Sequence, residues 1–138
     1  MTSLWLIVGG SLFGFLGLLH ALYTLADISH PRRLVPDNAA VMQAMSASGV
    51  RLAGGGTTMW RTWVGLNFSH SLGVVMFSFG CIAVGLSLGS LALPKAALLV
   101  PVAIGAIYFL LAVLYWFRVP AIGVAAGTLC LIIAWWVY

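Results

Sequence analysis

The sequence contains very little charge. Only 6% of its 138 residues are charged, as six Lys or Arg and two Asp, and there is no glutamate. A soluble domain carries about 25% charged residues, so this chain cannot cover a surface that faces water. The scarcity of charge excludes a soluble enzyme, a nucleic-acid-binding protein and a disordered tail. The length suits a single domain, residues 1–138.

Long apolar runs take the place of charge. Hydrophobic residues make up 63% of the chain, and the charges leave uncharged stretches at 1–26, 62–94, 96–117 and 119–138. A helix needs about 20 residues to cross the hydrocarbon core. We therefore expect an all-α integral membrane protein, a bundle of four transmembrane helices near 4–28, 59–88, 95–118 and 120–137. The first run lacks the basic start of a signal peptide, so we expect a mature helix there.

The basic residues predict the orientation. One expected side carries a single basic residue, Lys95, whereas the other carries five: Arg32, Arg33, Arg51, Arg61 and Arg118. Cytoplasmic loops of membrane proteins carry an excess of Lys and Arg. We expect both termini outside the cytoplasm.

The loop 29–58 is expected to lie on the membrane surface. Asp37 is placed to cap a short, weakly amphipathic helix from Asn38 to about Ser48. The run 54–56 is three glycines, which suits a sharp reversal before a cap at Thr57 or Thr58. Arg51, Gly55 and Arg61 could hold the phosphate of a lipid head group, or the glycines could be a plain hinge.

Polar residues inside two of the apolar runs are the main functional indication. His20, Thr24 and Asp27 share one face of the first helix, and Trp60, Trp63, Asn67 and His70 share one face of the second. His20 and His70 each lie about eight residues, or about 12 Å, from the cytoplasmic end of their helices. Because the two helices run in opposite directions, the imidazoles should meet at one level.

Several functions fit these polar residues on the facing sides of the two helices. Ionisable residues in a bilayer usually face a bundle interior or a cavity, which favours a site for a small hydrophobic or amphipathic ligand or a lipid head group. The same groups could instead hold helices together in an accessory subunit of a larger complex. His20 and His70 could also ligate a b-type haem, or act as acid and base on a lipid. The expected ligand-binding set is His20, Thr24, Asp27, Trp63, Asn67, His70 and Tyr115.

Other features carry less information. Asp27 lies roughly 10 Å of helix below His20, too far to share a metal ion with it. Gly123 and Gly127 form a small-xxx-small pattern that suits either a homo-oligomer or close packing within the chain. Cys81 and Cys130 fall at different depths, so we expect packing residues and no disulfide.

A resemblance points to the same polar residues. The stretch from Trp60 to Gly73, with its Gly-x-Asn-x-Ser-His run, resembles a family of small, uncharacterised bacterial membrane proteins in which a His and a Thr recur on the first helix. The matching positions are Trp60, Gly65, Asn67, Ser69, His70, His20 and Thr24. The resemblance covers about the first eighty residues and implies a multi-pass protein of the bacterial inner membrane. It carries no established activity.

Overall fold

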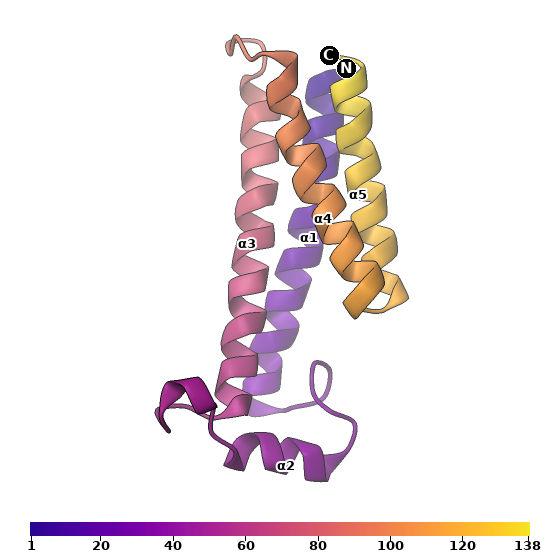
Figure 1. Ribbon diagram of the computed structural model, residues 1–138. Helices are drawn as coiled ribbons and strands as arrows, with labels where there is room; N and C mark the ends of the chain where they lie inside the picture. Colours follow the sequence, from indigo (N-terminus) through magenta and orange to yellow (C-terminus); the bar gives the residue numbers. More distant parts are fainter. The chain divides into compact units, whose positions relative to one another are not determined.

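The computed structural model describes residues 1–138 and is built from helices (Figure 1). The five α-helices and two short 3-10 helices are α1 (Thr2–Ser29), α2 (Ala39–Ala47), η1 (Arg51–Ala53), α3 (Met59–Ser87), η2 (Lys95–Leu98), α4 (Leu99–Tyr115) and α5 (Arg118–Trp136). No strand forms, and a lone antiparallel bridge joins Gly49 to Thr58. The expected all-α class is confirmed.

Four helical segments are long and apolar enough to cross a membrane. They are Thr2–Ser29, Met59–Ser87, Lys95–Tyr115 and Arg118–Trp136. The shortest has 19 residues, or about 28 Å at 1.5 Å per residue, close to the thickness of a hydrocarbon core. The four apolar helices expected from the charge pattern are therefore present.

Two helix boundaries differ from the predicted ones. Trp116 and Phe117 adopt extended backbone, with φ near −118° at both (−117° and −119°). The third apolar helix therefore ends at Tyr115 and the fourth begins at Arg118, three and two residues before the predicted boundaries near 118 and 120. Pro120 lies in the first turn of α5, where its missing N–H has no helical partner to lose. Pro101 is likewise the third residue of α4, after the 3-10 turn that delays the start of this helix.

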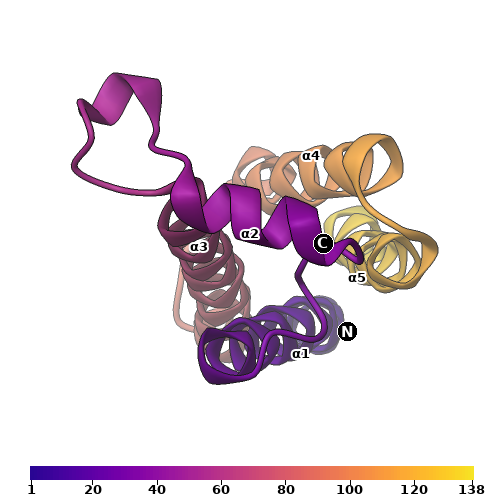
Figure 2. The ribbon, with the colours of Figure 1, turned by 90° about the horizontal axis from the view of Figure 1, so that it is seen from below.

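The loop before α3 mostly follows the sequence prediction. Asn38, and not Asp37, caps α2, because its side chain accepts a hydrogen bond from the N–H of Ala40 at 2.9 Å. Gly54 and Gly55 have φ of +56° and +90° and make the reversal. Thr58 caps α3 by accepting from the N–H of Arg61 at 3.3 Å. In Figures 1 and 2, α2 runs crosswise to α3, close to the start of that helix.

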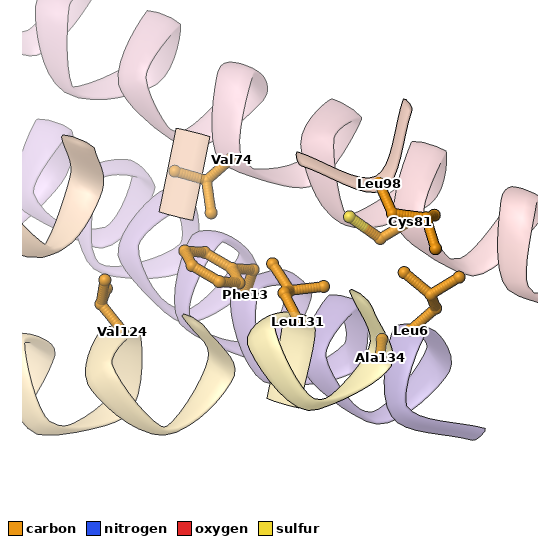
Figure 3. Packing of buried hydrophobic residues seen from close by; sticks show 8 residues of the cluster. All are labelled: Leu6, Phe13, Val74, Cys81, Leu98, Val124, Leu131 and Ala134. Carbon is orange, nitrogen blue, oxygen red and sulfur yellow. The ribbon is translucent and has the colours of Figure 1, made fainter. Parts of the chain in front are cut away.

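The chain forms two compact units. The core unit comprises Met1–Gly17 and Val74–Tyr138, and the histidine unit comprises Leu18–Gly73. Each of α1 and α3 contributes one part to each unit. The two chain termini lie at the same end of the core unit (Figure 1). The buried residues of the core unit, drawn in Figure 3, are Leu6, Phe13, Val74, Cys81, Leu98, Val124, Leu131 and Ala134.

Glycines allow the helices of the core unit to approach closely. A Cβ added at Gly127 would lie 2.8 Å from the ring of Phe13, and one at Gly123 would lie 2.9 Å from Leu16. The small-xxx-small pair of α5 therefore packs on α1 within the chain. Cys81 and Cys130 are free and buried.

Candidate functional site

Asn67 joins the two helices of the histidine unit. Its Nδ2 donates to the backbone carbonyl of Trp63 at 2.8 Å, and its Oδ1 lies 2.8 Å from Nε2 of His20. A carbonyl oxygen can only accept, so the amide nitrogen must face Trp63 and the amide oxygen must face His20. Nε2 of His20 therefore carries the proton and donates to Asn67. This bond fixes both the ring orientation and the tautomer of a neutral His20.

His70 lies beside this anchored ring. The centroids of the two imidazoles are 5.3 Å apart and their planes meet at 75°, an edge-to-face contact. Both side chains are half-buried. The matched depths in the sequence predicted this meeting of His20 and His70, and the structure confirms it. We call these two residues the histidine pair.

Hydroxyl groups around the pair satisfy backbone carbonyls of their own helices. Thr24 donates to the carbonyl of His20 at 2.9 Å, and Ser71 donates to that of Asn67 at 2.9 Å. Both hydroxyl-bearing side chains are buried. Bonds of this i to i−4 kind are common for Ser and Thr inside apolar helices. They keep the surroundings of the pair free of unsatisfied hydroxyls.

Asp27 organises the chain that leaves α1. Its buried carboxylate accepts hydrogen bonds from the backbone N–H groups of Arg32, Arg33 and Leu34, at 2.9, 3.1 and 2.6 Å. The carbonyl of Leu34 in turn accepts from the indole N–H of Trp63 at 2.7 Å. A continuous path of bonds thus runs from Asp27 through the loop to Trp63, Asn67 and His20.

These contacts divide the seven residues of the expected ligand-binding set according to their partners. Six of the seven lie in the histidine unit. Asp27 and Trp63 use their polar atoms to hold the loop, so they are positioning residues. The loop partner Leu34 could not be found from the sequence, because it takes part only through its backbone. Arg33 was found only as a charge, yet its guanidinium lies 4.7 Å from the centroid of the Tyr23 ring, a cation–π contact.

The seventh predicted residue, Tyr115, belongs to the core unit. It is the last residue of α4 and its side chain is 76% exposed. A contact between Tyr115 and the histidine pair stays a prediction. Tyr108 of the same helix packs in the core unit, where its ring lies 6.0 Å from that of Phe13 and 6.2 Å from that of Phe77, centroid to centroid.

The glycine-rich turn uses several of its own polar groups. The N–H of Gly54 donates to the carbonyl of Arg51, and the N–H of Gly56 donates to that of Ala53 at 3.0 Å. The N–H of Arg61 is taken by Thr58. These bonds favour the hinge interpretation for the backbone. The exposed side chains of Arg51 and Arg61 still provide positive charge.

The polar groups do not suit a metal ion or a haem. No group of three or more His, Cys, Asp or Glu side chains is placed to hold a metal ion. Two axial histidines must aim a nitrogen each at an iron with the macrocycle between them. Here the rings touch edge to face, and Nε2 of His20 donates to Asn67. The arrangement instead brings two imidazoles into contact, one of them oriented by Asn67.

Comparisons with protein-family models, curated proteins and solved structures find no match to this chain. The residues of the histidine unit therefore carry the functional argument by themselves.

Proposed function

We propose that this chain is a multi-pass protein of a bacterial inner membrane that binds the polar group of a small amphipathic ligand or lipid at the histidine pair. The observation that carries the proposal is the contact between two half-buried imidazoles, His20 and His70, within helices apolar enough to span a bilayer. Imidazole supplies both a donor and an acceptor, which suits an oxygen-rich head group.

The alternative of simple helix adhesion explains less of this geometry. One interhelical bond, from His20 to Asn67, already ties α1 to α3. A second histidine against the first adds another ionisable group at a depth where such groups are costly. Arg51 and Arg61 of the same unit would complement an anionic head group.

A change in melting temperature tests the proposal. Wild type that retains lipid during gentle extraction should melt several degrees above wild type that has been delipidated. Ligand that binds only the folded state stabilises it by about 2.7 kcal/mol at a hundredfold excess over Kd. His20→Ala and His70→Ala should lose most of this difference. His30→Ala is the matched control, because His30 is exposed and bonds Ser29 outside the pair.

The accessory-subunit alternative makes the opposite prediction. It is favoured by the unbroken path of bonds from Asp27 to His20, since such a path would also serve to join helices. If His20 and His70 only hold α1 and α3 together, their alanine variants should lower the melting temperature equally with and without lipid. That result would remove the ligand site and favour the subunit interpretation.

The proposed orientation places both termini outside the cytoplasm. Leu52 in the loop between α2 and α3 is 99% exposed, and Ser90 lies in the exposed turn after α3. Single cysteines at these positions, with Cys81 and Cys130 changed to alanine, should react differently with an impermeant maleimide in intact cells. Ser90→Cys should be labelled and Leu52→Cys protected. The reverse pattern would overturn the orientation.

A further inference from the structure

The core unit contains a cavity that the histidine pair does not share. Its volume is about 280 Å³, and its walls come from α1, α3, α4 and the chain that joins α3 to α4. Gly80 and Val84 of α3, Pro101 and Ile104 of α4, and Leu6 of α1 are among its lining residues. Leu6 lies close to Cys81 and Leu98, two more lining residues, in Figure 3.

The lining of this cavity defines the chemistry of what it can hold. Apart from the thiol of Cys81, every side chain on its wall is hydrocarbon or glycine. A water molecule needs two to four polar partners to occupy a cavity, and apolar cavities stay dry. A cavity of about 150 Å³ binds a benzene ring, so this one has room for about ten carbon atoms. It fits a segment of one hydrocarbon chain and no polar head group.

We propose that this cavity is a slot for one hydrocarbon chain of a membrane lipid. Its walls belong to three of the helical segments that are apolar enough to span a bilayer, so the medium around them would itself be hydrocarbon. The slot rests on the membrane placement proposed above, but not on ligand binding at the histidine pair.

Gly80 has a role in the slot that the other helical glycines of the core unit do not share. A Cβ at Gly9, Gly10, Gly85 or Gly127 would meet a neighbouring atom at 3.1 Å or less. A Cβ at Gly80 would meet nothing within 4 Å, although Gly80 lines the cavity. Helix packing therefore does not require a glycine here. Its effect is to leave open the space that a chain would fill.

Photolabelling tests the slot directly. The probe is a phosphatidylcholine with a diazirine near the end of one acyl chain, titrated into the 138-residue chain in dodecylmaltoside micelles. We expect labelling of the α3 peptide around residues 77–84 and the α4 peptide around 100–104 to saturate near one probe per protein. Gly80→Phe fills the slot and should reduce this labelling at least fivefold, and Gly80→Leu should reduce it less.

The matched control is Gly65→Phe. Gly65 is also an exposed glycine of α3 with no atom within 4 Å of an added Cβ, but it does not line the cavity. Its substitution should leave the labelling unchanged. Labelling that rises without a plateau, that survives Gly80→Phe, or that falls equally in Gly65→Phe would overturn the slot. A lipid-dependent melting temperature that persists alongside such a result would leave the histidine site standing.

Discussion

The two units of this chain hold their helices together by different means. In the core unit, glycines let helix surfaces meet, as where Gly127 receives the ring of Phe13. In the histidine unit, hydrogen bonds join the helices, as where His20 donates to Asn67. Both devices suit a bilayer, in which association between helices depends on close packing and polar contacts.

The comparison between the two units indicates which of them could bind a polar ligand. Close packing against glycine fixes shape mainly through apolar contacts, such as that of Gly127 with Phe13. Hydrogen bonding fixes shape as well, but it requires polar side chains within apolar helices, and such side chains are costly in a bilayer. The histidine unit brings two half-buried imidazoles into contact, which is why we propose the ligand site there. The predictions below test this division between the units.

The largest expected effect is in the core unit. Gly127→Leu places a side chain where the ring of Phe13 already lies, 2.8 Å from the added Cβ. Forcing extra atoms into a packed interior costs about 1–3 kcal/mol and occasionally more, so we expect about 3 kcal/mol in reversible unfolding. Gly65→Leu, which meets open space, should change stability by less than about 0.5 kcal/mol. Equal effects would show that glycine packing does not hold the core unit.

A somewhat smaller loss is expected at Asp27. Asp27→Ala removes the acceptor for the backbone N–H groups of Arg32, Arg33 and Leu34. A buried donor left without a partner costs about 1–3 kcal/mol, and part of this cost will be recovered by water at the loop. We expect about 2 kcal/mol, together with faster protease cleavage between residues 30 and 37. Unchanged cleavage would contradict the role of Asp27 in holding this loop.

A still smaller loss of stability is expected at Asn67. Asn67→Leu breaks the bond to His20 while keeping an apolar side chain of similar size. Interhelical hydrogen bonds in membranes are worth about 0.6 kcal/mol on average, so we expect about 1 kcal/mol or less from unfolding measurements. The lipid-dependent part of the melting temperature should nevertheless fall, because the ring of His20 loses its orientation. A variant that keeps this lipid dependence would show that Asn67 does not position the pair.

The smallest effects come from one substitution made in both units. Thr24→Val loses the bond from the hydroxyl to the carbonyl of His20. Thr128→Val removes a buried hydroxyl of the core unit that has no hydrogen-bond partner. Because an unsatisfied polar group is unfavourable, Thr128→Val should be neutral or stabilising by up to about 1 kcal/mol. Thr24→Val should be neutral or slightly destabilising. If Thr128→Val destabilised the protein more than Thr24→Val, the contrast between the units would be contradicted.

The spacing of charged and polar residues in the sequence predicts the four apolar helices and the contact between His20 and His70. The four apolar runs follow from the spacing of eight charges, and the depths of His20 and His70 follow from counting residues along two antiparallel helices. The sequence predicts Asp37 as the cap of α2, but the structure shows Asn38 in this role. The two could not be told apart beforehand, because Asp and Asn are both favoured at the N-cap. The role of Asp27 was also missed, because its partners are backbone N–H groups of a loop whose path no periodicity defines.

Nitrogen NMR of the imidazoles tests the central claim most directly. The chain has three histidines, so a sample with ¹⁵N-labelled histidine should give three side-chain signal sets, assigned with the single alanine variants. Adding a total lipid extract of the expression host to protein in dodecylmaltoside should shift the signals of His20 and His70 and leave those of His30 in place. Three unchanged sets, or a shift confined to His30, would contradict a ligand site at the histidine pair.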